Sequence, residues 1–396
     1  MRAHQACSAM AVVAALTAAP YMAHAGPTFW HGDEGFVTLN YELQIWTQWR
    51  DNYRSDEVGG DYFDTFLRRN RITLDGYYND YVGFYAQIEA GNDDKYGDFD
   101  RSVYYRDAYV SVDYLDAMRF MLGRFKNTFS RENLEACLEP LTLDRSINSY
   151  TPFAGSRDTG FAVWGNLFNA SAQYRLMIAS GRKGDNVPKD PPPRVTARVH
   201  YSVFDPEWSY GYRGTYLGNR RILTFGAAYD YQEDAVYGNL PGRTDADDYQ
   251  AWTVDFFYEE PTALGTFTLS AAYFDYSVND ALLVDDELQG DDQLLDPEIP
   301  PNAQMEAYYV KAGYLLPGDV GVGQLQLFAR YDGSDFDRDD DYYDRDSVAV
   351  GFNYYIDGQD LKVTAEYQDV VFEEEHPDVY SLQDHSQATI GFQMRF

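Results

Sequence analysis

The sequence lacks a long apolar run and is poor in cysteine, and each shortage narrows the class of protein. After Gly26 no stretch approaches the roughly 20 apolar residues that a membrane helix needs. A chain of this kind can enter a membrane only as strands that pair all their backbone groups. Cys7 and Cys137 are the two cysteines, and the single thiol beyond the N-terminal segment cannot form an internal disulfide. We therefore expect a fold held together by a closed hydrogen-bond network.

Signatures of catalysis and of cofactor binding are also missing. The histidines beyond the N-terminal segment are His31, His200, His376 and His385. No serine or cysteine near them resembles a nucleophile elbow or a catalytic triad, and thiols and imidazoles are too few and too scattered for a zinc or haem site. We expect neither an enzyme nor a cofactor.

Basic residues are scarce in the second part of the chain. The net charge is −33, and 24 Lys and Arg stand against 27 Asp and Glu up to Phe225. From Gly226 onward, 7 basic residues stand against 37 acidic ones. The acidity thus belongs almost wholly to the second part, and we expect no nucleic-acid partner.

The N-terminal segment has the features of a secretory signal peptide. Arg2 precedes an apolar run from Ala6 to Ala19, and Ala23-His24-Ala25 forms a small-x-small cleavage site. A retained membrane anchor is the alternative, but the run is too short to cross a bilayer. We expect residues 1–25 to be removed and residues 26–396 to form the mature domain.

From Phe36 onward the sequence alternates apolar and polar residues in segments of about 10, which is typical of an outer-membrane barrel. In the first segment Val37, Leu39 and Tyr41 share one face, while Asn40 and Glu42 share the other. Such segments predict sixteen antiparallel strands in an all-β transmembrane barrel, near residues 36–50, 63–76, 81–91, 104–115, 118–126, 157–166, 169–181, 194–204, 220–232, 249–259, 265–277, 305–316, 324–332, 346–356, 361–372 and 385–396. An even number of strands places both termini in the periplasm.

The connections are expected to alternate between short periplasmic turns and long outer loops, with 232–248 among the long loops. The third outer loop, from Lys126 to Ser156, carries Phe129, Leu134, Leu138, Leu141, Leu143, Ile147 and Phe153. We expect this loop to fold into the pore, where its apolar residues find packing partners. The connection from Asp205 to Asn219 is longer than a periplasmic turn should be.

The last segment resembles the C-terminal assembly signal of Gram-negative outer-membrane proteins. Ala388, Ile390, Phe392, Met394 and the terminal Phe396 share one face. We therefore expect location in the cell outer membrane, contact with its lipid and lipopolysaccharide, and recognition by the barrel-assembly machinery.

If the apolar faces meet lipid, several arginines face the lumen. Arg69 and Arg71 alternate with outward Ile72 and Leu74, and by the same parity Arg175, Arg194, Arg198 and His200 face inward. One hypothesis is that these arginines brace the wall by pairing with lumen carboxylates such as Glu42, Glu89, Asp107 and Asp113. The other is that their planar donor groups form a path for oxyanions.

Four blocks of the sequence resemble the phosphate-selective porin O and P family. They are Phe66-Leu67-Arg68-Arg69-Asn70-Arg71-Ile72-Thr73-Leu74-Asp75-Gly76, then Gly123-Arg124-Phe125-Lys126-Asn127-Thr128-Phe129-Ser130-Arg131-Glu132, then Asp144-Arg145-Ser146, and Arg157-Asp158-Thr159-Gly160. The resemblance covers roughly residues 60 to 180. It implies a sixteen-stranded, usually trimeric barrel whose third outer loop folds into the pore and whose basic lumen residues pass phosphate or related anions.

Residue by residue, the resemblance assigns Arg69 and Arg71 to the family's arginine-rich second strand and Lys126 to the end of its Gly-x-Phe-Lys motif. Arg145 and Arg157 match the basic positions around the end of the loop. Together with the lumen parity, the candidate pore-lining and anion-binding residues are Arg69, Arg71, Lys126, Arg131, Arg145, Arg157, Arg175, Arg194 and Arg198. The acidic second part departs from a dedicated phosphate channel.

The sequence therefore predicts a porin that forms a water-filled channel for small hydrophilic solutes, with anions such as phosphate or polyphosphate preferred, and a homotrimer. Two alternatives stay open. The acidic second part favours a non-selective or cation-leaning general porin. Acidic runs at 285–292, 335–341 and 373–375 favour a barrel whose loops bind divalent metal or surface partners, because clustered carboxylates suit calcium and magnesium.

Overall fold

The computed structural model describes residues 26–31, 35–51, 60–90, 103–149, 156–181, 188, 191–239, 244–278, 304–337, 342–375 and 382–396. The predicted signal peptide at 1–25 lies outside these residues, so its removal stays a prediction. No helix within the described ranges is both long enough and apolar enough to cross a membrane.

Strands make up almost all of the described chain. Their bounds are β1 (Thr28–His31), β2 (Gly35–Arg50), β3 (Tyr62–Tyr77), β4 (Val82–Ala90), β5 (Val103–Leu115), β6 (Met118–Lys126), β7 (Arg157–Leu167), β8 (Ala172–Ala179), β9 (Arg194–Ser202), β10 (Ile222–Asn239), β11 (Thr244–Thr262), β12 (Gly265–Ser277), β13 (Met305–Leu315), β14 (Gln324–Phe336), β15 (Arg345–Asp357), β16 (Leu361–Phe372) and β17 (His385–Arg395). Two short helices, α2 (Arg131–Leu134) and η1 (Ile147–Ser149), lie between β6 and β7.

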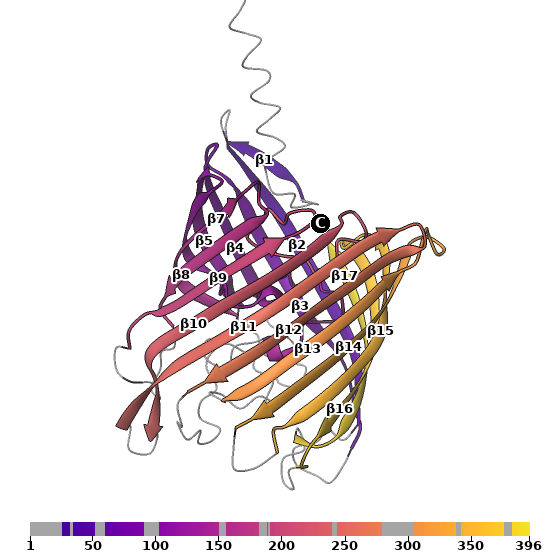
Figure 1. Ribbon diagram of the computed structural model, residues 1–396. Coiled ribbons are helices and arrows are strands. Elements are labelled where there is room, and N and C mark those ends of the chain that lie inside the picture. Colours follow the sequence, from indigo (N-terminus) through magenta and orange to yellow (C-terminus); the bar gives the residue numbers. More distant parts are fainter. Residues whose placement is uncertain are drawn as a thin grey trace, which may run out of the picture.

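Strands β2 to β17 form a closed antiparallel barrel in which each strand pairs with its neighbours in sequence (Figure 1). Closure comes from β17 and β2, whose register runs from Gln387 opposite Arg50 to Arg395 opposite Glu42. The short β1 pairs with the start of β2, beyond the end of β17. Sixteen strands thus close the sheet, as the alternating pattern predicts, and closure removes the unpaired edges that a membrane could not tolerate.

The alternation of side chains separates an apolar outer surface from a charged interior. Along β9 every second residue is buried, and Arg194, Arg198 and His200 point inward while Val199 and Tyr201 are exposed. The same rule holds in β3, where Ile72 and Leu74 are exposed. Because successive side chains of a strand point to opposite faces, one alternating segment supplies both a lipid surface and a lumen wall.

The hairpin between β10 and β11 differs from the prediction of a long loop over 232–248. Both strands continue past this region, with Val236 opposite Asp247 and Asn239 opposite Thr244. A bulge between Gln232 and Val236 interrupts the register. The acidic composition predicts a loop, but backbone pairing does not require apolar side chains, and the apolar residues Ala235 and Val236 of this stretch are buried.

Candidate functional site

The third outer loop lies inside the barrel and crosses to the opposite wall. Its described part, Asn127–Ser149, is called the inner loop below. Asn353 Nδ2 donates to Leu141 O at 2.8 Å, and Gln393 Nε2 donates to Leu138 O at 2.9 Å. Near its end, Asn148 Nδ2 donates to the carbonyls of Tyr308 at 3.1 Å and Gly333 at 2.9 Å. Contacts with β13, β14, β15 and β17 therefore hold a loop that leaves the wall at β6.

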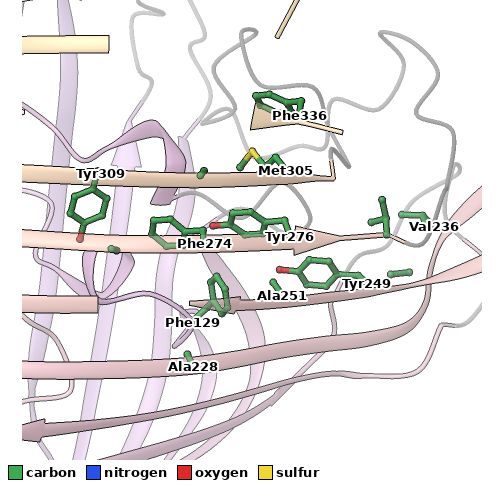
Figure 2. Close-up of a cluster of buried hydrophobic side chains, with 14 residues drawn as sticks. Phe129, Ala228, Val236, Tyr249, Ala251, Phe274, Tyr276, Met305, Tyr309 and Phe336 are labelled. Carbon is green, nitrogen blue, oxygen red and sulfur yellow. The ribbon is translucent and has the colours of Figure 1, made fainter. Parts of the chain in front are cut away.

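Apolar side chains of the inner loop pack where the opposite wall is aromatic or has glycine. Phe129 lies with its ring centroid 5.8 Å from that of Tyr276, in the cluster of Figure 2. A Cβ at Gly313 would come within 2.6 Å of Leu141 Cδ1, so glycine at this position makes room for the leucine. The predicted inward fold of the loop follows from these contacts, because its apolar residues are buried only inside the barrel.

Arg69 and Arg71 both point into the barrel from β3 and both bind carboxylates. Arg69 Nη2 donates to Asp144 Oδ1 at 2.9 Å, and Arg71 Nε donates to Glu89 Oε1 at 2.9 Å. Burial alone would raise the pKa of Asp144, but Arg69, Arg68 and Arg145 hold the pKa of that carboxyl well below its usual range. Asp144 thus stays charged and ties the inner loop to β3.

Two further arginines reach the interior because bulges change the side-chain parity. The register passes from Arg69 to Leu67 opposite β2 and from Asp107 to Tyr105 opposite β4. The skipped residues are Arg68 and Arg106. Arg68 Nη2 donates to Asp144 at 2.8 Å, and Arg106 Nη1 donates to Glu89 at 2.6 Å. Strict alternation in the sequence placed neither side chain in the lumen, because a bulged residue does not follow the two-residue period.

Lys126, Arg145 and Arg157 come together around Cys137, and these four residues are called the thiol cluster. Arg145 Nη2 lies 2.9 Å from Cys137 Sγ, and Arg157 Nη2 lies 3.9 Å from it. Lys126 Nζ and Arg145 Nη2 both donate to the backbone carbonyl of Glu135. Arg157 also pairs with Asp107 at 3.2 Å. Two guanidinium groups, from the inner loop and β7, thus contact one buried sulfur, and Lys126 of β6 shares the Glu135 carbonyl with Arg145.

The electrostatics of the thiol cluster favour a negative charge at its centre. Burial by itself would raise the pKa of Cys137, but Arg145, Lys126, Arg71 and Arg157 together hold it well below the ordinary thiol value. A thiolate is the form that such a site stabilises. The sulfur therefore stands where an anionic atom is preferred.

The other predicted cations lie on β8, on β9 and in α2 of the inner loop. Arg131 donates two hydrogen bonds of 2.8 Å to Glu207, and Arg198 donates to Asp255 at 2.6 and 2.8 Å. Arg194, at the start of β9, pairs with Asp230. Arg175 donates to Tyr210 O at 2.6 Å, and among the described residues it forms no ion pair.

A second inward segment, which the sequence did not place, supplies several of these partners. The connection 203–221 between β9 and β10 leaves the barrel end where the short turns lie, and its Tyr212 N donates to Leu134 O of the inner loop at 3.2 Å. Ala136 N donates back to Tyr212 O at 3.0 Å. The unusual length of this connection was the one available signal. Its destination could not be predicted, because only the assembled barrel brings it beside the inner loop.

All nine candidate residues thus face the interior, and they divide into two groups. Ion pairs with carboxylates hold Arg69, Arg71, Arg131, Arg157, Arg194 and Arg198, as the wall-bracing hypothesis expects. Lys126, Arg145 and Arg175 instead show hydrogen bonds to neutral oxygens or to the thiol. Within the described residues no group of three or more His, Cys, Asp or Glu could hold a metal ion. The acidic runs at 285–292 and 339–341 lie outside the described residues.

Comparison with known proteins agrees with this architecture. A sequence model of the phosphate-selective porin O and P family matches residues 39–396. No curated protein matches the chain. Three similar solved structures are Salmonella typhi OmpF in complex with daunomycin (14% identity, TM-score 0.60, covering 93% of this chain and 99% of that one), an anion-selective porin from Comamonas acidovorans (13%, 0.56, 92% and 100%) and the trimer form of OmpT from Vibrio cholerae (12%, 0.53, 92% and 100%).

At these identities the solved structures show a common fold, whereas the family match spans the barrel from β2 to its last residue. The chain therefore belongs to the phosphate-selective porin O and P family and is a diffusion channel of the outer membrane.

Proposed function

We propose that this channel prefers anions and that small oxyanions such as phosphate bind at the thiol cluster. The single observation that carries the proposal is the convergence of Arg145 and Arg157 on the Cys137 sulfur, with Lys126 beside them on the carbonyl of Glu135. These residues present N–H donors toward a position that already favours negative charge. The several N–H donors of a guanidinium group match the several oxygens of an oxyanion better than they match a single chloride ion.

Local charge explains how an acidic chain can prefer anions. The net charge of −33 resides mainly beyond Gly226, whereas the inner loop approaches the wall of β2 to β9, which carries the cations. At an effective dielectric of about 20, a unit charge about 7 Å from an ion is worth about 2 kcal/mol. The cations of the thiol cluster therefore act more strongly on an ion beside them than screened carboxylates farther away.

We also propose that three copies assemble, with the outer faces of some strands buried between them. The trimer form of Vibrio cholerae OmpT shares the fold. The barrel would reach the membrane through the assembly machinery that recognises its last strand, and would then contact lipid and lipopolysaccharide. Cross-linking of the detergent-extracted protein tests the oligomer, because a single species of monomer mass would contradict it.

Reversal potentials in planar bilayers under a potassium chloride gradient test the anion preference. The unmodified channel should prefer chloride to potassium, and added phosphate should block the chloride current. Lys126→Gln and Arg145→Gln should each lower the anion-to-cation permeability ratio several-fold. Arg221→Gln is the control, because Arg221 pairs with Glu260 on the exposed surface.

The opposite result identifies the alternative channel type. Cation preference in the unmodified protein, or unchanged ratios in both variants, would overturn the proposal. The acidic second part would then govern selectivity, as in a cation-leaning general porin.

A further inference from the structure

The connection 203–221, called the inner connection below, docks on the inner loop through its backbone. Besides the two hydrogen bonds between Tyr212 and the inner loop, Gly214 N donates to Glu139 O at 3.0 Å. A Cβ at Gly214 would lie 2.5 Å from Leu141 N, so this approach requires glycine. An ion pair between Arg131 and Glu207 joins the same two segments at 2.8 Å. The inner connection is therefore seated on the inner loop in a specific register.

The docking places the Tyr212 hydroxyl among basic side chains of the barrel wall. Arg175 Nη1 donates to this oxygen at 2.7 Å and Arg198 Nε at 3.5 Å, while His200 Nδ1 contacts it from the same strand as Arg198. Arg131 stacks over the ring, with its guanidinium carbon 4.5 Å from the centroid. With two guanidinium donors on the oxygen, the hydroxyl hydrogen is best directed at Nδ1 of His200, which leaves Nε2 as the N–H.

The N–H groups of Arg175, Arg198 and His200 are called the donor set below. They are more numerous than one phenol oxygen can satisfy. Arg175 Nε and His200 Nε2 have no hydrogen-bond partner within the described residues, although the two side chains are only 1% and 3% exposed. Buried donors are costly to leave unpaired. Arg175 also has no carboxylate neighbour in the described chain, unlike Arg198, which pairs with Asp255. An oxyanion offers several acceptor oxygens in place of one.

The donor set adjoins the thiol cluster. Tyr210 OH donates to the backbone carbonyl of Lys126 at 3.3 Å, and Arg175 Nη2 donates to Tyr210 O at 2.6 Å. The backbone carbonyl of Glu135 accepts from Lys126, and Glu135 also forms an isolated β-bridge with Tyr212. The thiol cluster and the donors around the Tyr212 hydroxyl are therefore connected through Tyr210 and Glu135.

We propose that Arg175, Arg198 and His200 form a second oxyanion site whose anion position is occupied by the Tyr212 hydroxyl, so that the inner connection is a latch displaced by a passing anion. This inference rests on the proposed anion channel and adds a site and a gate to it. With the latch closed, the phenol oxygen satisfies part of the donor set and the inner connection narrows the inner half of the lumen. With an anion bound, the two guanidinium groups exchange the phenol for the oxyanion, and His200 carries a hydrogen on Nδ1, because Nδ1 without a hydrogen would repel the anion.

Tyr212→Phe tests the latch, because it removes the competing oxygen and keeps the ring that stacks on Arg131. Inorganic phosphate is the probe, measured as block of the chloride current in planar bilayers and as heat of binding to the detergent-purified protein. The half-blocking phosphate concentration should fall about tenfold, which corresponds to one hydrogen bond to a charged group. Adding Arg175→Gln should abolish the gain. Tyr216→Phe is the matched control, because the Tyr216 hydroxyl binds Glu207 rather than a cation.

The outcomes separate the latch from the proposed function. If phosphate blocks the unmodified channel and Tyr212→Phe leaves the block unchanged or weaker, the latch is wrong and the anion channel stands. If only Tyr212→Phe shows block and binding heat, the masked site is supported and the thiol cluster is not the main site. If neither protein binds phosphate, both proposals are overturned.

Discussion

The two sides of the lumen are built from different residues. The wall of β2 to β9 carries the cations, among them Arg69, Arg71 and Arg198, each matched to a carboxylate. The wall of β10 to β14 is aromatic in its outer half, with Tyr249, Phe274, Tyr276 and Tyr309 buried beside small alanines (Figure 2). The aromatic wall offers packing to the inner loop, and the basic wall offers charge to a solute. The aromatic wall thus holds the inner loop by packing, whereas the basic wall holds Asp144 of the same loop by ion pairs.

The largest effect is expected from removing one member of a buried ion pair on the basic wall. Arg198→Gln leaves Asp255 charged and buried without its guanidinium partner. Breaking such a pair costs about 3 to 5 kcal/mol. Urea unfolding of the refolded barrel should show this loss, and Arg221→Gln in the exposed pair with Glu260 should show little change. Equal stability of both variants would mean that the basic wall is not braced by its carboxylates.

Truncating Phe129 tests the packing of the inner loop against the aromatic wall. Phe129→Ala eliminates the packing of the inner loop against Tyr276 and Phe274, and burial of a phenylalanine is worth about 3 to 5 kcal/mol relative to alanine. We expect the loop to leave the wall in part, with larger and noisier single-channel conductance and a weaker anion preference. Phe225→Ala, on the outer face of β10, is the control of equal volume change. Unchanged conductance would show that polar contacts alone hold the loop.

A smaller effect, on ion selectivity, is expected from changing the charge at the thiol cluster. The neighbouring cations lower the pKa of Cys137, and where the thiol is ionised the thiol cluster is one charge less positive than in the Cys137→Ser variant. Cys137→Ser should therefore raise the anion-to-cation permeability ratio about threefold to tenfold, on the order of 1 kcal/mol. As the pH falls through the pKa of Cys137, the thiolate gains a proton and the two proteins should converge. No difference between the two proteins at any pH would show that Cys137 is neutral throughout.

The smallest effect concerns one hydrogen bond of the aromatic wall. Tyr276 OH donates to Asn148 O at 3.1 Å, and its loss in Tyr276→Phe should cost about 1 kcal/mol. Because the ring remains beside Phe129, the loop should stay seated. Protease accessibility of the loop should rise slightly, while conductance stays at the unmodified value. A conductance change as large as that of Phe129→Ala would assign the anchoring to the hydrogen bond instead of the ring.

Local sequence predicted most strands and the orientation of most lumen residues. In β9 the order Arg194, Val195, Thr196, Ala197, Arg198 determines which side chains face water, because a strand has a period of two. The same reasoning fails at Arg68 and Arg106, where a bulge in the partner register turns an extra arginine inward. The prediction of a loop over 232–248 is also wrong, because the backbones of β10 and β11 pair again beyond a bulge in this acidic stretch.

By itself, the sequence determined the barrel, its strand number and the side of each strand that carries charge, because these follow from local alternation and from closure of the backbone hydrogen bonds. Only the tertiary structure decided which cations have carboxylate partners and which converge on Cys137 or Tyr212. Those contacts join residues far apart in the chain, from β3 to the inner loop and from β8 to the inner connection. Which of these residues meet depends on how the inner loop and the inner connection cross the lumen, and no local sequence pattern encodes that path.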